Sequence, residues 1–197
     1  MKSAYNFKVT KLRIFLLFIM HFQKILPDSK QFIIINNIYE SSFPIDERRD
    51  YENFINILNS KSNIFSLEAA FTENGEIVGF ISHWDFEDFI YIEHFAVDEE
   101  LRGHGYGRTI IESFQSRTHL PIILEVELPD CEMSIRRINF YERLGFTLHS
   151  NVKYIQPSYG EGRKERELKL MTYGKIDIAE NCRQIAMIKK EVYNKQQ

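Results

Sequence analysis

The chain has few cysteines and no excess of basic charge. Cys131 and Cys182 are the only two cysteines in 197 residues, and neither belongs to a metal-binding spacing. Lysine and arginine number 25 against 28 aspartates and glutamates, a net charge of −3. The isolated cysteines argue against a disulfide framework and favour a reducing, cytoplasmic location. Without a basic stripe or zinc-finger spacing we expect no nucleic-acid partner, and we expect no metal.

The chain also lacks an apolar run long enough to span a bilayer. The most apolar stretch, Ile14 to Met20, reads "IFLLFIM", far short of the ~20 residues that a membrane helix needs. Basic residues precede it, as in a secretory signal, but the following "HFQKILPD" offers no small-residue cleavage site. We therefore expect membrane association to be absent, or weak attachment at best.

The first thirty residues differ in charge from the rest. Residues 1–30 carry six Lys/Arg and one Asp, or +5, which leaves −8 for the remainder. We predict a basic, apolar arm over residues 1–30 and one domain over residues 31–197. The arm is either an additional helix packed on the domain or on a second copy, or an upstream extension with Met20 as the true start. A monomer and a homodimer both remain open.

Apolar periodicity and turn residues predict an alternating series of helices and strands. Helices are predicted over residues 32–43, 46–60, 108–117, 133–145 and 177–193, and strands over 64–72, 77–86, 89–97, 121–128, 146–155 and 166–174. The resulting order is α-α-β-β-β-α-β-α-β-β-α. This order predicts an α/β (α+β) fold with a mostly antiparallel, mixed central sheet and helices on both faces.

A glycine-rich stretch, "RGHGYGR", joins the predicted strand ending at Val97 to a helix. Free N–H groups at a helix N-terminus attract anions, and glycines let a phosphate approach the backbone closely. Arg102 and Arg108 add donors for phosphate oxygens. No Gly-Lys-Ser/Thr follows, and no parallel βαβ unit surrounds the stretch, so Walker A and dinucleotide sites are excluded. The stretch predicts a pyrophosphate site, and a glycine turn without a ligand is the alternative.

Two segments resemble a known family. Residues 93–108, "EHFAVDEELRGHGYGR", resemble the acetyl-CoA signature R/Q-x-x-G-x-G/A of the GNAT N-acetyltransferases, and residues 138–146, "INFYERLGF", resemble that family's later helix-plus-strand motif. The resemblance covers about residues 32–174. It implies the acyl-CoA N-acyltransferase (GNAT) fold and an N-acetyltransferase that moves an acetyl group from acetyl-CoA to a primary amine by direct attack. The acceptor is a small-molecule or protein amine, and the alternative is a noncatalytic acetyl-CoA sensor.

The resemblance implies two catalytic residues. Glu93 would be the base, because the family often places one on this strand and an ammonium must lose a proton before it attacks. Strand alternation puts Tyr91, Glu93, Phe95 and Val97 on one face and His94 on the other. The alternative for Glu93 is a charge on a solvated strand face. Tyr141 would protonate the departing thiolate, and plain packing is its alternative.

The resemblance also implies contacts to acetyl-CoA. Backbone N–H groups around Phe95, Ala96 and Val97 would hold the thioester carbonyl and the pantetheine arm. Asn139 is a side-chain candidate for the pantetheine, whereas Ser134 stands where many relatives carry an asparagine. The pyrophosphate site comprises Arg102, Gly103, His104, Gly105, Tyr106, Gly107 and Arg108.

Overall fold

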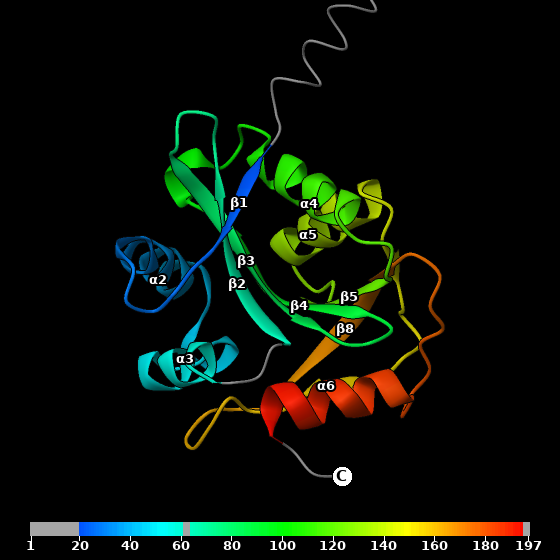
Figure 1. The fold of residues 1–197 in the computed structure, drawn as a ribbon. Coiled ribbons are helices and arrows are strands. Elements are labelled where there is room, and N and C mark those ends of the chain that lie inside the picture. Colours follow the sequence, from blue (N-terminus) through cyan, green and yellow to red (C-terminus); the bar gives the residue numbers. More distant parts are fainter. Residues whose placement is uncertain (1–19, 61–63, 195–197) are drawn as a thin grey trace, which may run out of the picture.

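The computed structural model describes residues 20–60 and 64–194 (Figure 1). The strands are β1 (His21–Lys24), β2 (Phe65–Phe71), β3 (Ile77–Asp85), β4 (Ile90–Val97), β5 (Ile122–Glu127), β6 (Thr147–Leu148), β7 (Tyr154–Gln156) and β8 (Arg166–Tyr173). The helices are α2 (Lys30–Ser42), α3 (Tyr51–Leu58), α4 (Tyr106–Ser116), α5 (Glu132–Arg143) and α6 (Arg183–Tyr193). Short 3-10 turns lie at Ile45–Glu47 and Glu99–Leu101.

The strands form one mixed sheet in the order β1-β2-β3-β4-β5-β8-β6, with β7 also paired to β8. Within the described ranges, β4 and β5 are the only parallel pair, and all other pairings are antiparallel. Helices α4 and α5 cover one face of the sheet, and α2, α3 and α6 cover the other (Figure 1). The predicted fold class is therefore confirmed. We call the two sides the α4 face and the α6 face.

Three of the described helices begin where the sequence supplies capping side chains. Ser29 accepts a hydrogen bond from the Phe32 N–H at the start of α2, and Asp50 accepts one from the Asn53 N–H at the start of α3. At α5, Cys131 and Ser134 cap each other reciprocally. These bonds satisfy N–H groups that have no partner inside the helix. The starts of α2, α3 and α5 are therefore determined locally, whereas α4 and α6 begin without a capping side chain.

Two elements differ from the expected series. Strand β1 pairs with β2, and Ile25, just beyond it, is buried in the core. The sheet therefore begins inside the segment that the sequence sets apart as residues 1–30. The single strand expected over 146–155 is two short strands, since Leu148 pairs with Met171 and Tyr154 with Leu168. Leu148 and Tyr154 are further apart in the sequence than their partners Met171 and Leu168 on β8, so the extra residues between the two short strands form a turn.

The predicted absence of a membrane span concerns mainly the segment Ile14–Met20, of which residues 14–19 lie outside the described residues. In the ranges that the structure describes, no helix combines the length and the apolar character needed to cross a bilayer.

Candidate active site

The parallel strands β4 and β5 separate partway along their length. Their paired positions run from Ile90 with Ile122 to Ile92 with Leu124, whereas β4 continues to Val97 and β5 to Glu127. Beyond Ile92 the facing edges of the two strands have no ladder partner in the described part of the chain. Free backbone N–H and C=O groups at such an edge can pair with an added extended chain. We call this opening the splay, and Phe95, Ala96 and Val97 line its β4 side.

A β-bulge lies at the start of the splay. Ser82 pairs with His94 and His83 with Ile92, so Glu93 is an extra residue with no Cα partner on β3. A bulge shifts the side-chain alternation by one position. Tyr91 packs in the core of the α6 face, whereas Phe95 and Val97 pack against the core of the α4 face. The expected common face for these three residues and Glu93 is therefore wrong.

The same bulge changes the expected position of His94. Its ring packs edge-on against Tyr39 and Phe43 on the α6 face, where the Glu93 carboxylate also lies, 3.9 Å away. The expectation that His94 and Glu93 point to opposite faces is thus wrong. Burial lowers the pKa of His94, so the imidazole is neutral near pH 7. Its Nε2 lies 3.0 Å from the Glu47 carbonyl oxygen.

Glu93 is not on a solvated strand face, because its side chain is only 1% exposed. Arg49 Nη2 donates to Glu93 Oε1 at 2.8 Å, and Trp84 Nε1 donates to Oε2 at 2.7 Å. Both carboxylate oxygens are therefore occupied. Glu93 is a buried counter-ion, and any proton that it accepts must compete with these two bonds.

Arg49 is a side chain of this site that the sequence analysis did not single out. It lies just before α3, packs over the Tyr159 and Trp84 rings, and donates from Nη2 to the Val192 carbonyl oxygen at 2.8 Å. Its Nε is buried and has no hydrogen-bond partner among the described residues. In the sequence Arg49 is one charge in "DERRD", and nothing distinguishes it from its neighbours.

A second carboxylate, Glu125, faces the α6 side from β5. It lies one residue beyond the last β4–β5 pair. Tyr154 donates to its Oε1, Gln156 Nε2 donates to Oε2 at 2.8 Å, and the Tyr193 hydroxyl donates to Oε2 at 3.1 Å. Burial raises the pKa of Glu125 to about 7, although these hydrogen bonds oppose the rise.

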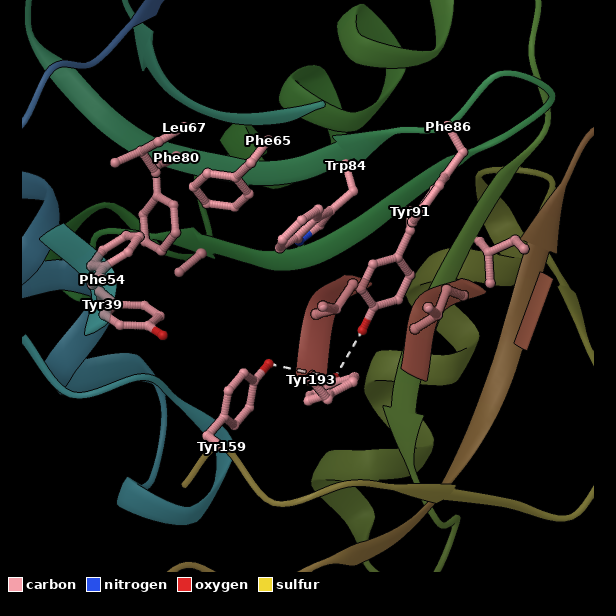
Figure 2. Packing of buried hydrophobic residues seen from close by; sticks show 14 of the residues in the cluster. Tyr39, Phe54, Phe65, Leu67, Phe80, Trp84, Phe86, Tyr91, Tyr159 and Tyr193 are labelled. Carbon is pink, nitrogen blue, oxygen red and sulfur yellow. Dashed lines mark hydrogen bonds between the residues drawn. The ribbon is translucent and has the colours of Figure 1, made fainter. Parts of the chain in front are cut away.

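Tyrosine hydroxyls connect the two sides of the splay. The Tyr193 hydroxyl lies 3.1 Å from that of Tyr91 and 3.5 Å from that of Tyr159, and both hydroxyls point toward it (Figure 2). Tyr159 in turn lies 3.5 Å from His94 Nε2. A hydrogen-bonded series therefore runs from Glu125 through Tyr193 and Tyr159 to His94. We call Tyr91, Tyr154, Tyr159 and Tyr193 the tyrosine cluster.

A cavity of about 340 Å³ borders this cluster on the α6 side. Its lining residues come from the α3 region, the end of β3, the loop after β7 and the end of α6: Arg49, Asn53, Asn56, Ile57, Ser60, Trp84, Tyr159, Glu191, Val192, Tyr193 and Asn194. A larger cavity of about 420 Å³ lies between α2 and the β2–β3 turn and shares no residue with this site. Glu93 and Glu125 do not line the smaller cavity, but their hydrogen-bond partners Arg49, Trp84 and Tyr193 do.

Tyr141 lies on the opposite face of the sheet from Glu93. It is buried on α5 against the Phe140 and Phe146 rings, with ring centroids 5.1 and 5.4 Å away. Burial raises the pKa of Tyr141 to about 12, and Arg137 opposes the rise. The hydroxyl is therefore protonated at neutral pH, as an acid must be.

The glycine stretch forms an open loop at the start of α4. Gly103 and Gly105 have φ of +83° and +88°, and a Cβ at either position would meet nothing within 4 Å. The N–H groups from Gly103 to Arg108 donate no hydrogen bond within the described residues. This loop has the free donors and the open space that a pyrophosphate needs.

The side chains around this loop are partly anchored. Arg102 donates from Nε to the Val97 carbonyl oxygen at 3.1 Å and from Nη2 to Ser42 Oγ at 3.0 Å. Arg108 pairs with Glu112 at 2.8 Å, and His104 Nδ1 lies 3.3 Å from the Leu101 carbonyl oxygen. Arg102 is thus held at the end of β4, beside the splay.

The residues expected on the pantetheine side differ in environment. Asn139 is exposed on α5, beside Phe140, whose ring stacks on Phe95. Ser134 is buried, and its hydroxyl is used in the α5 cap with Cys131. Ser134 therefore has a local structural role. In the ranges that the structure describes, no group of three or more His, Cys, Asp or Glu side chains is arranged to hold a metal ion.

Comparison with known proteins adds independent evidence. Residues 61–148 match the family model of the acetyltransferase (GNAT) domain. A solved structure from Bacteroides thetaiotaomicron, assigned to the GNAT acetyltransferase family, is 36% identical with a TM-score of 0.82, over 89% of this chain and 99% of that one. YjbC of Bacillus subtilis, assigned as an acetyltransferase, is 27% identical over 114 residues, or 57% of this chain and 56% of that protein. The match thus spans about half of YjbC.

Two more distant structures share the fold. The spermidine/spermine N-acetyltransferase SpeG of Vibrio cholerae is 16% identical with a TM-score of 0.54, over 78% of this chain and 91% of that one. The ribosomal-protein-S18-alanine N-acetyltransferase of Escherichia coli is 18% identical with a TM-score of 0.51, over 83% and 98%. At this identity the likeness concerns the fold alone.

Proposed function

Since this chain belongs to the GNAT family of acetyltransferases, we propose that it moves an acetyl group from acetyl-CoA directly to a primary amine. The observation that carries the proposal is the splay between β4 and β5 beside the open glycine loop. A pantetheine arm can pair with the free edge of β4, while the pyrophosphate binds at the start of α4.

The cofactor contacts follow from this placement. The N–H groups from Gly103 to Arg108 bind the pyrophosphate, and Arg102 adds a charged donor. Backbone groups of Phe95, Ala96 and Val97 bind the pantetheine and the thioester carbonyl. Asn139 stays a candidate at the exposed end of this path, because its side chain is unobstructed.

The chemistry requires two proton transfers. The amine nitrogen attacks the thioester carbon, a C–N bond forms, and the C–S bond breaks. The amine must lose a proton, and the departing thiolate must gain one. We propose that Tyr141 gives its hydroxyl proton to the sulfur, because its pKa of about 12 keeps the phenol protonated.

Glu93 is the base that the family resemblance implies. Its two oxygens are bonded to Arg49 and Trp84, so a proton on Glu93 would neutralise the charge that pairs with Arg49. If Glu93 is the base, Glu93→Gln lowers turnover most at low pH, and the rate recovers as free amine becomes available. A folded Glu93→Gln enzyme with the wild-type pH profile of turnover would contradict this assignment.

Glu93→Gln is also expected to destabilise the fold. The change leaves Arg49 as a buried charge without a counter-ion, which costs about 3–5 kcal/mol of unfolding free energy. Denaturant unfolding followed by circular dichroism measures this loss. Glu47→Gln is the matched control, because Glu47 pairs with the more exposed Arg166, and we expect a loss of about 1 kcal/mol or less.

The acceptor is an amine on a small molecule or on a protein. Structural relatives include enzymes named for a polyamine and for an alanine of a ribosomal protein, so the fold is compatible with both classes of acceptor. The cavity beside Arg49 and Tyr159 is the proposed acceptor site. We also propose a cytoplasmic location from the isolated cysteines, and either a monomer or a homodimer.

The test of the proposed function has two stages. A thermal-shift screen should show stabilisation by acetyl-CoA, and free-thiol release should then be measured across a panel of small amines and peptides. Thiol release that depends on an amine supports the transferase. Binding of acetyl-CoA with no release across the panel would instead favour the sensor alternative.

A further inference from the structure

Glu125 is a buried carboxyl group that the sequence did not single out. It lies on β5 in the splay, on the same face of the sheet as Glu93. Burial of a carboxyl group costs more free energy than burial of a hydrophobic side chain of similar size, so a buried carboxyl group points to a specific role. Tyr154, Gln156 and Tyr193 all donate to it, so the surrounding side chains are arranged for its charged form.

The two carboxylates have different partners. Glu93 faces a cation, and both its oxygens are bonded, one of them to that cation. Glu125 faces hydroxyl and amide groups only: Tyr91 from β4, Tyr154 and Gln156 from β7, and Tyr193 from α6. A carboxylate with neutral partners can accept a proton without breaking an ion pair. Neighbouring carboxylates whose surroundings differ in this way often have different roles in catalysis.

Tyr193 connects Glu125 to the proposed acceptor site. Its hydroxyl donates to Glu125, and the residue itself lines the cavity beside Arg49 and Tyr159. Figure 2 shows Tyr193 at the centre of the cluster, with the hydroxyls of Tyr91 and Tyr159 directed at it. Because Tyr193 lines this cavity and also donates to Glu125, it connects the cavity to the buried carboxylate.

From this geometry we propose that Glu125, acting through the Tyr193 hydroxyl, takes up the proton that the acceptor amine loses. The amine N–H bond breaks as its proton passes to the Tyr193 oxygen, and Tyr193 passes its own proton to a Glu125 oxygen. Glu125 later releases that proton to solvent. Glu93 then serves as the counter-ion that holds Arg49. The inference rests on the proposed acetyl transfer to an amine.

The environment of Glu125 favours this role near neutral pH. Burial raises its pKa to about 7, which is close to the best value for a base in that range. The other charged groups nearby are Lys189, over the Tyr154 ring at 5.6 Å, and the Arg49–Glu93 pair. His94 is neutral. The charge of Glu125 therefore changes near pH 7.

The experiment compares pH profiles of turnover. Wild type, Glu125→Gln, Tyr193→Phe and the double variant are assayed by thiol release with one acceptor amine between pH 5.5 and 9. The acceptor amine also titrates in this range, and its titration affects all four proteins equally. The turnover of wild type should rise with pH, with an apparent pKa near 7. Glu125→Gln should lose this rise, and its turnover above pH 7 should be about 100-fold lower than that of wild type. The double variant should be no slower than either single variant.

A matched control is Glu127→Gln, two residues along β5, where the glutamate pairs with the half-exposed Arg137. It should keep the wild-type rise near pH 7. If Glu125→Gln fails to fold, Tyr193→Phe alone tests the route, because it leaves the carboxyl in place and removes the connection.

The outcomes are distinguishable. Retention of the rise near pH 7 in Glu125→Gln or Tyr193→Phe overturns this inference while the acetyl transfer stands. Loss of the rise in Glu93→Gln alone assigns the base to Glu93 and also overturns it. Absence of thiol release from wild type with any amine removes the proposed function, and this inference falls with it.

Discussion

Replacement of Gly105 by aspartate is expected to abolish acetyl-CoA binding. Gly105 caps α4 with φ of +88°, and the space above it is open. An aspartate would place a carboxylate where the pyrophosphate is expected. Opposed like charges cost several kcal/mol, so affinity should fall on the order of 100-fold or more. Isothermal titration calorimetry with acetyl-CoA measures the change.

The control for this variant is Gly75→Asp. Gly75 lies in the β2–β3 turn with φ of +80°, and a Cβ there also meets nothing within 4 Å. The backbone strain and the added charge are thus the same in both variants. Gly75→Asp should bind acetyl-CoA like wild type. Equal affinities of the two variants for acetyl-CoA would contradict the proposal that the glycine loop binds its pyrophosphate. Tighter binding of NAD than of acetyl-CoA would contradict it as well.

Tyr141→Phe is expected to lower turnover by roughly 10- to 1000-fold, as the loss of a general acid does. The change removes only the hydroxyl, and the ring keeps its contacts with Phe140 and Phe146. Acetyl-CoA affinity should therefore change little. Because the pKa of Tyr141 is about 12, its loss should affect turnover similarly from pH 6 to pH 9.

Tyr173→Phe provides the comparison for Tyr141→Phe. Tyr173 packs against Phe146 in the same apolar cluster, but it comes from β8. The same chemical change there should leave turnover within about 2-fold. Normal turnover of Tyr141→Phe on a good acceptor would mean that Tyr141 is a packing residue only.

The free energy of unfolding should also depend on the protonation of Glu125. The pKa of Glu125 rises from 4.5 to about 7 on folding, so the folded state holds this proton more firmly than the unfolded state. This proton therefore stabilises the folded state fully below about pH 4.5, and the stabilisation is lost as the pH rises through about 7. Relative to Glu125→Gln, wild type should lose on the order of 3 kcal/mol between pH 5 and pH 8. Urea unfolding at both pH values measures the difference, and equal losses in both proteins would contradict the raised pKa.

Local patterns in the sequence were sufficient for most of the fold. The first two helices were predicted from residues 32 and 46, and they begin at Lys30 and Tyr51, directly after the capping residues Ser29 and Asp50. The strand before the glycine loop and the positive φ of Gly103 and Gly105 also follow from local residue types. These features depend on neighbours within a few residues, which a sequence shows directly.

Longer-range features were not predictable in the same way. Strand β1 has a short, mixed pattern, and its pairing with β2 joins residues more than forty positions apart. The bulge at Glu93 depends on the register between β3 and β4. A register shift of one residue exchanges the two faces of a strand, and for this reason the simple alternation through Tyr91 and Phe95 failed.

By itself, the sequence determined the fold class, the glycine loop before α4 and the family resemblance, because each depends on residue types at short spacings. The tertiary structure alone decided the surroundings of the carboxylates. Arg49 reaches Glu93, and Tyr193 reaches Glu125, over 44 and 68 positions of sequence. A carboxylate's charge and reactivity depend on burial and on the groups that surround it, and chain folding brings those groups together from α3, β4, β5, β7 and α6.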